Sequence, residues 1–157
     1  MAMQSDALIP VSWRSRPRSF VALMSLYESN FLRLRGLCGD PSQLAGERLS
    51  RVQDDCDLLL TVTEQTPYTT ALNLTYLLPD EGAGQEGDGL LRFPDMEIRI
   101  YADARLAEAR GWSPQIRHPM LGEMQKGLVR GLDLRWAMNI MLNKWLEYCL
   151  ERGHRFT

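Results

Sequence analysis

The chain has 157 residues, of which 45% are apolar and 24% are charged, and its formal net charge at pH 7 is -2. This length is typical of one domain, and we expect residues 1–157 to form a single globular unit. The small net charge gives no overall attraction to nucleic acid or to an anionic membrane. Three cysteines without a CxxC spacing predict neither a disulfide framework nor a zinc site.

The N-terminal residues 1–17 contain Pro10 and Pro17 and are predicted to form an irregular arm. They lack a basic region followed by an apolar one, and no apolar run approaches the ~20 residues of a membrane span. We therefore expect a cytoplasmic protein without a membrane partner. Nucleic acid is not an expected partner either, because no strand alternates basic and aromatic residues.

A helix is predicted after the arm, over residues 19–37. Ser19 is a good N-cap, and apolar residues then recur at three- and four-residue spacing: Phe20, Leu23, Met24, Tyr27, Phe31 and Leu34. Gly36, Gly39 and Pro41 end the helix. The next residues change to a period of two. They predict a short strand at 47–52 and a hairpin of strands at 57–63 and 70–77.

Residues 79–89 are acidic and rich in glycine, and we expect a mobile loop there. Met96, Ile98 and Ile100 then alternate with polar residues, which predicts a strand with one buried face and one polar face. Residues 102–104 form a plausible turn into a shorter run at 105–110.

The last long helix is predicted over residues 132–152, after a segment with a short helix at 120–129. Its main apolar face includes Leu134, Met138 and Trp145, whereas Trp136 and Ile140 fall on the far side. A helix that is apolar on more than one face needs a second partner. Trp136 and Ile140 are therefore candidates for a homodimer contact.

Four stretches in this order resemble the YqiB-like family of uncharacterised bacterial proteins, a family filed as a domain of unknown function. They are YESNFLRLRGL (27–37), TPYTTAL (66–72), PDMEIRIYADARLAEA (94–109) and NKWLEYCLERG (143–153). The resemblance begins at about Phe20. Residues 111–131 and the arm before Pro17 depart from the family pattern. The resemblance implies a cytoplasmic protein and no particular activity.

The strand of alternating residues carries the best group of polar side chains. The candidate ligand-binding residues are Glu97, Arg99, Tyr101, Asp103 and Glu108. Arg99 would bind an anion, Tyr101 would stack or donate a hydrogen bond, and Glu108 would orient Arg99. The alternative is a solvated sheet face with cross-strand ion pairs.

Catalytic and cofactor sites are not predicted. The two histidines, His118 and His154, have no metal-ligand or triad spacing, and His154 is expected beside the C-terminal end of the last helix. Asp103 and Glu108 alone make a poor metal site. No glycine-rich nucleotide motif is present, so no metal and no cofactor are expected.

These observations predict an α+β fold. A single antiparallel sheet of four to five strands has the N- and C-terminal helices packed on one face. The preferred function is that of a non-catalytic binding or adaptor protein, whose polar sheet face holds a small anionic ligand or a protein partner. The alternatives are a hydrolase acting on a nucleotide or phosphoester, with Asp103, Glu108 and Arg99 in its site, and a structural homodimer without a ligand.

Overall fold

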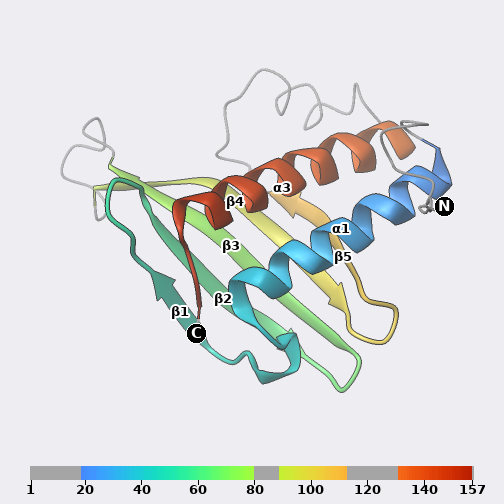
Figure 1. Cartoon of the computed structure of the whole chain (residues 1–157), viewed down its shortest axis with the longest axis horizontal. Helices are drawn as coiled ribbons and strands as arrows, with labels where there is room; N and C mark the ends of the chain where they lie inside the picture. Colours follow the sequence, from blue (N-terminus) through green and yellow to red (C-terminus); the bar gives the residue numbers. More distant parts are fainter. Residues whose placement is uncertain (1–18, 80–88, 113–130, 157) are drawn as a thin grey trace, which may run out of the picture.

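The computed structural model describes residues 19–79, 89–112 and 131–156 (Figure 1). Its elements are helix α1 (Phe20–Cys38), the 3₁₀ turn η1 (Pro41–Gln43), strands β1 (Glu47–Ser50), β2 (Asp57–Gln65), β3 (Thr69–Pro79), β4 (Leu90–Tyr101) and β5 (Leu106–Trp112), and helix α3 (Leu132–Arg152). The predicted arm at 1–17, nearly all of the predicted loop at 79–89 and the short helix at 120–129 lie outside the described residues.

The five strands form one antiparallel sheet in the order β1-β2-β3-β4-β5, so each strand pairs with its neighbours in sequence. Both predicted hairpin strands are present, and the turn between β4 and β5 occupies residues 102–105. This arrangement confirms the predicted α+β fold, and the sheet, expected to have four to five strands, has five.

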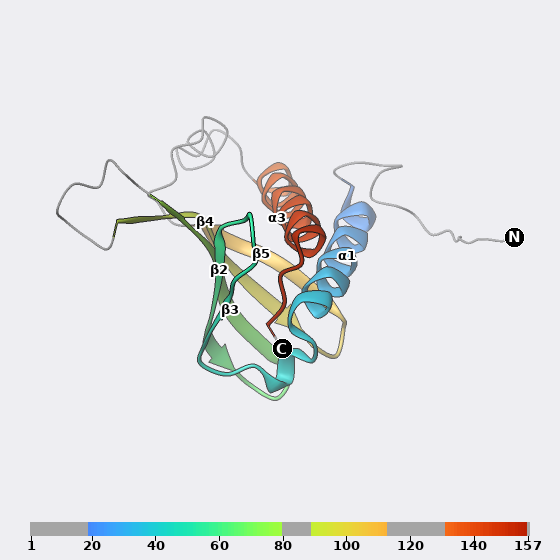
Figure 2. The same ribbon diagram turned by 60° about the vertical axis from the view of Figure 1, so that its left-hand side comes forward.

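Both helices lie on the same face of the sheet, side by side (Figure 2). The two helices run parallel to each other. Asn30 of α1 contacts Asn139 of α3, and Arg33, which comes later in α1, contacts Glu147, which comes later in α3. Helix α1 begins where Ser19 Oγ accepts a hydrogen bond from the Ala22 amide, as the N-cap prediction requires. None of the helices within the described ranges has the length and hydropathy to cross a membrane.

The core lies between the helices and the sheet. Met96, Ile98 and Ile100 of β4 are fully buried in one cluster with Phe31 of α1 and Trp145 of α3, which confirms the face predicted by the alternation. The prediction that Phe20 belongs to the buried face of the first helix was wrong, because Phe20 is 68% exposed. Phe20 is the first residue of α1 and therefore lies at the end of the helix.

An asparagine cluster, Asn30, Asn139 and Asn143, fixes the two helices to the outer edge of β5. Asn139 Oδ1 accepts a hydrogen bond from the Ala109 amide at 2.8 Å, and Asn30 Nδ2 donates to the Ala107 carbonyl at 3.4 Å. Asn30 also donates to Asn139 and accepts from Asn143. All three side chains are buried. Amides that both donate and accept can satisfy buried backbone groups at a sheet edge where no further strand pairs.

Candidate functional site

Strand β5 carries a β-bulge at Arg110. Ile98 of β4 pairs with Ala109, whereas the preceding β4 residue, Glu97, pairs with Gly111, so Arg110 has no partner of its own. A bulge bends its strand and re-aims the side chains beside it. Arg110 Nη1 lies 3.6 Å from Glu108 Oε1, two residues before it on the same strand.

The Glu108 carboxylate is held by a tyrosine as well as by Arg110. The Tyr101 hydroxyl donates a hydrogen bond to Glu108 Oε1 at 2.6 Å. Burial, followed by the hydrogen bond and the charge of Glu108, raises the pKa of Tyr101. Burial and the neighbouring Glu108 also raise the pKa of Tyr27 to about 12. Both hydroxyls therefore stay protonated at neutral pH and can donate to the carboxylate.

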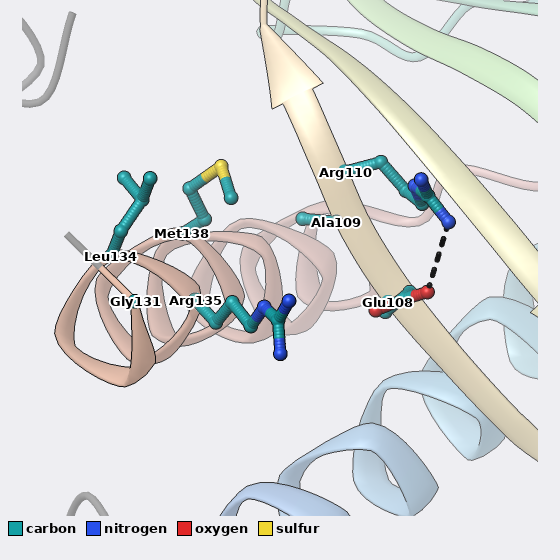
Figure 3. Close-up of a pocket in the computed structure, with 7 residues that line it drawn as sticks. All are labelled: Glu108, Ala109, Arg110, Gly131, Leu134, Arg135 and Met138. Carbon is teal, nitrogen blue, oxygen red and sulfur yellow. Dashed lines mark ion pairs between the residues drawn. The ribbon is translucent and has the colours of Figure 1, made fainter. Parts of the chain in front are cut away.

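Glu108 and Arg110 line a concavity between β5 and the N-terminal end of α3, which we call the β5–α3 hollow (Figure 3). Its volume is about 490 Å³, within the range of small-molecule sites. Within the described part of the chain, the residues that line it are Glu108, Ala109, Arg110, Gly131, Leu134, Arg135 and Met138.

Arg135 reaches from α3 toward the strand that carries Glu108 (Figure 3). Its backbone carbonyl accepts a hydrogen bond from Asn139 Nδ2, so the asparagine cluster also fixes the first turns of α3 against β5. Arg110 and Arg135, from separate elements, thus line one concavity together with Glu108. The N-terminal end of a helix adds positive potential to such a place.

The structure distributes the five predicted ligand-binding residues over four places. Tyr101 and Glu108 are in contact, and Glu108 lines the hollow. Arg99 lies directly across the ladder from Glu108, but its ion pair is with Glu64, at 3.6 Å between Nη2 and Oε1. Glu97 is exposed beside Asn73 on the polar face of the sheet, and Asp103 is exposed in the β4–β5 turn.

The two residues predicted at a homodimer contact have neighbours within the chain. Trp136 and Ile140 are half-buried and pack against a cluster of Leu23, Leu26 and Tyr27 on α1. The second partner that their apolar character requires is thus supplied by α1. A contact with a second copy stays a prediction.

A separate polar cluster lies at the other end of the sheet. His154 is buried between Ser50 and Asp55: its Nδ1 is 2.8 Å from Ser50 Oγ, and its Nε2 is 2.8 Å from Asp55 Oδ2. Tyr76 donates a hydrogen bond to the same oxygen of Asp55 at 2.8 Å. We call Ser50, Asp55, Tyr76 and His154 the C-terminal anchor.

Charge in the C-terminal anchor is stabilised by hydrogen bonds. Burial acts to raise the pKa of Asp55, but the hydrogen bonds from Tyr76 and His154 outweigh it and hold that pKa below its usual value. The chain beyond the anchor is also fixed, because the Phe156 amide donates to the Leu37 carbonyl at 2.7 Å. His154 follows the end of α3, as predicted, and its amide donates to the Cys149 carbonyl.

The anchor has the residue types of a hydrolase triad but not its working geometry. Ser50 Oγ also accepts a hydrogen bond from the Arg155 amide, and Ser50 is 95% buried, since its exposed fraction is 5%. A nucleophile needs access to its substrate and an oxyanion site beside it. The arrangement is that of a closed structural cluster. In the described part of the chain, no three His, Cys, Asp or Glu side chains gather in a way that could hold a metal ion.

Sequence reasoning missed Tyr27, Arg110 and Arg135 as residues of the site. Tyr27 and Arg135 lie on helices that approach β5 only in the folded chain, so sequence spacing holds no signal for them. Arg110 had a weak signal, since the glycine that follows it is a common residue at bulges.

Comparison with known proteins assigns the chain to a family. Residues 33–155 match the family model described as "Protein of unknown function (DUF1249)". The chain belongs to this family. The match covers β1 to β5 and α3 together with the C-terminal anchor, so both polar clusters lie inside the DUF1249 region.

The curated relatives agree with that assignment. The chain is 28% identical over 134 residues to "Uncharacterized protein YqiB" of Escherichia coli K12, and the alignment covers 85% of this chain and 90% of that protein. The YqiB protein of Escherichia coli O157:H7 matches with the same identity and coverage. No solved structure shows a significant match to the chain.

Proposed function

We propose that this protein binds a small anionic ligand in the β5–α3 hollow and does not act on it chemically. The observation that supports this proposal is the approach of Arg110 and Arg135, from β5 and α3, to one concavity of about 490 Å³. Guanidinium groups bind carboxylate and phosphate oxygens with charge-assisted hydrogen bonds. The proposal keeps the preferred function predicted from the sequence but moves the site from the open sheet face to the edge of β5.

The groups around the hollow favour binding over catalysis. Tyr27 has a pKa of about 12 and cannot act as a base at neutral pH. Glu108 already accepts a hydrogen bond from Tyr101 and pairs with Arg110, so its role is to position these groups. The hydrolase alternative would need Asp103 in the same site, and Asp103 is exposed in the turn.

A ligand screen with matched variants tests the proposal. The full chain is titrated with small carboxylates and with inorganic phosphate, and binding is followed by the shift in Tm and by NMR. We expect Arg135→Ala to weaken binding by about tenfold or more, because one charge-assisted contact is lost. Arg51→Ala is the control, since Arg51 pairs with Asp57 at the far end of the sheet.

Three results would count against the proposal. The first is the absence of binding by any anion in the screen. The second is equal weakening by Arg51→Ala and Arg135→Ala, which would indicate a non-specific charge effect. The third is turnover of a phosphoester that disappears in Asp103→Ala, which would favour the hydrolase.

A further inference from the structure

Strand β1 forms the edge of the sheet opposite β5, and within the described residues only β2 pairs with it (Figure 1). The Val62 amide donates to the Gly46 carbonyl at 2.8 Å, so these two residues are a hydrogen-bonded pair of the antiparallel ladder. Such pairs alternate along the ladder. Arg48 therefore also bonds to β2, whereas the backbone groups of Glu47 and Leu49 point outward. Outward amide and carbonyl groups on an edge strand can bond to a further strand.

Three exposed side chains follow this edge at two-residue spacing. They are those of Glu47, Leu49 and Arg51, the last of which directly follows β1, and this spacing places them on one face of the sheet. Leu49 is 43% exposed, and Glu47 has no ion-pair partner among the described residues. Arg51 pairs with Asp57 at 3.1 Å, but its side chain is 73% exposed. Its guanidinium group can therefore bind a second carboxylate.

The order of these side chains makes the edge complementary to a second copy of itself. In an antiparallel pair, residues with outward backbone groups lie opposite each other. A pairing centred on Leu49 places Leu49 opposite its counterpart in the second copy. It also places Glu47 of each copy opposite Arg51 of the other, and opposite charges at such positions stabilise the pair. A pairing centred on Glu47 or on Arg51 would instead bring like charges together.

From this complementarity we propose that the protein forms a homodimer in which β1 pairs antiparallel with β1 of a second copy. The contact is isologous, with the two-fold axis at Leu49, and the sheet of one copy continues into the sheet of the other. The asparagine cluster bonds backbone groups at the edge of β5, whereas no described residue does so on the outer side of β1. The β5–α3 hollow lies at the opposite edge and stays open in this dimer.

Sedimentation velocity of the full chain at increasing concentration tests for the dimer. A contact along one short strand is small, so we expect a Kd on the order of 100 µM. Leu49→Pro removes the amide that each copy donates at the two-fold axis but no hydrogen bond within the chain, and it should abolish the dimer. Amide spectra of this and every other variant show whether it is folded.

Charge reversal tests the register of the pairing. Glu47→Arg and Arg51→Glu each place like charges at both symmetry-related pairs, so each should weaken the dimer by about tenfold or more. A mixture of the two variants restores opposite charges at both pairs and should form a heterodimer. Glu28→Arg is the matched control, because Glu28 is exposed on α1 and the change in net charge is the same. It should neither weaken the dimer nor form a heterodimer with Arg51→Glu.

Three results would overturn the proposal. The first is a chain that stays monomeric at concentrations up to about 1 mM. The second is a dimer that persists in folded Leu49→Pro, which would place the contact elsewhere, for example at Trp136 and Ile140. The third is a mixture of the two charge-reversal variants that associates no more strongly than either variant alone.

Discussion

The two ends of the sheet contain similar side chains in different surroundings. In the C-terminal anchor, Asp55 accepts a hydrogen bond from Tyr76 and contacts His154. In the β5–α3 hollow, Glu108 accepts a hydrogen bond from Tyr101 and contacts Arg110. The difference is access: His154 is fully buried, whereas the Arg110 side chain is 47% exposed.

This difference determines what each cluster can do. A buried carboxylate and its partner are costly to separate, so the anchor holds the chain end against the sheet. An exposed arginine exchanges partners at little cost, so Arg110 can leave Glu108 for a ligand. The contrast predicts that substitutions in the anchor change stability, and that substitutions in the hollow change binding.

The largest effect is expected from His154→Ala. The substitution leaves Asp55 and Ser50 without their partner and removes a buried ring, so the free energy of unfolding should fall by about 3 kcal/mol. Urea unfolding of the two proteins measures the change. A loss below about 1 kcal/mol would show that the anchor does not hold the chain end.

The asparagine cluster should come next, because it connects the hollow to the core. Asn139→Ala leaves the Ala109 amide without its acceptor, and we expect a loss of about 2 kcal/mol. Hydrogen exchange at the Ala109 amide should become faster than at a core amide of β3 such as Leu74. Unchanged exchange at Ala109 would contradict this role for the cluster.

Acid should weaken the anchor. The pKa of Asp55 is lower in the folded chain than its usual value of 3.8, so Asp55 contributes stability above that pH. The contribution is lost as the pH falls through the folded-state pKa. Urea unfolding between pH 5 and pH 2 should therefore show a steeper fall for the natural chain than for Asp55→Asn. If the free energy of unfolding fell equally with pH in both proteins, the role of ionised Asp55 in the anchor would be contradicted.

The smallest effect on stability is expected from Arg110→Ala. Its ion pair with Glu108 is exposed and spans 3.6 Å, so the free energy of unfolding should change by about 0.5 kcal/mol or less. The same variant should weaken the binding of small carboxylates in the NMR titration of the ligand screen. A stability loss as large as that of His154→Ala would contradict the prediction that substitutions in the hollow change binding and not stability.

The fold could be predicted from the sequence because its signals are local. The alternation of Met96, Ile98 and Ile100 and the helical spacing after Ser19 identify the faces that meet in the core. The predicted burial of Phe20 was wrong, because the spacing of apolar residues does not show where along a helix the contact with the sheet ends.

The site could be predicted only in part, because it depends on contacts between distant segments. Tyr101 and Glu108 share one hairpin and were found together. Ser50, Asp55 and His154 were not, since about a hundred residues separate His154 from the other two. The acidic turn around Asp55 carried no sign that a histidine would fold back onto it.

The asparagine cluster has a consequence for how the protein meets other chains. A sheet edge with unbonded backbone groups invites another strand to pair with it, and this is a common start of aggregation. At β5 the Ala107 carbonyl and the Ala109 amide are already bonded to Asn30 and Asn139. The protein's own helices therefore block the pairing of another strand at these two residues. A molecule that binds at this edge of β5 must be recognised by the side chains of the protein and not by its backbone.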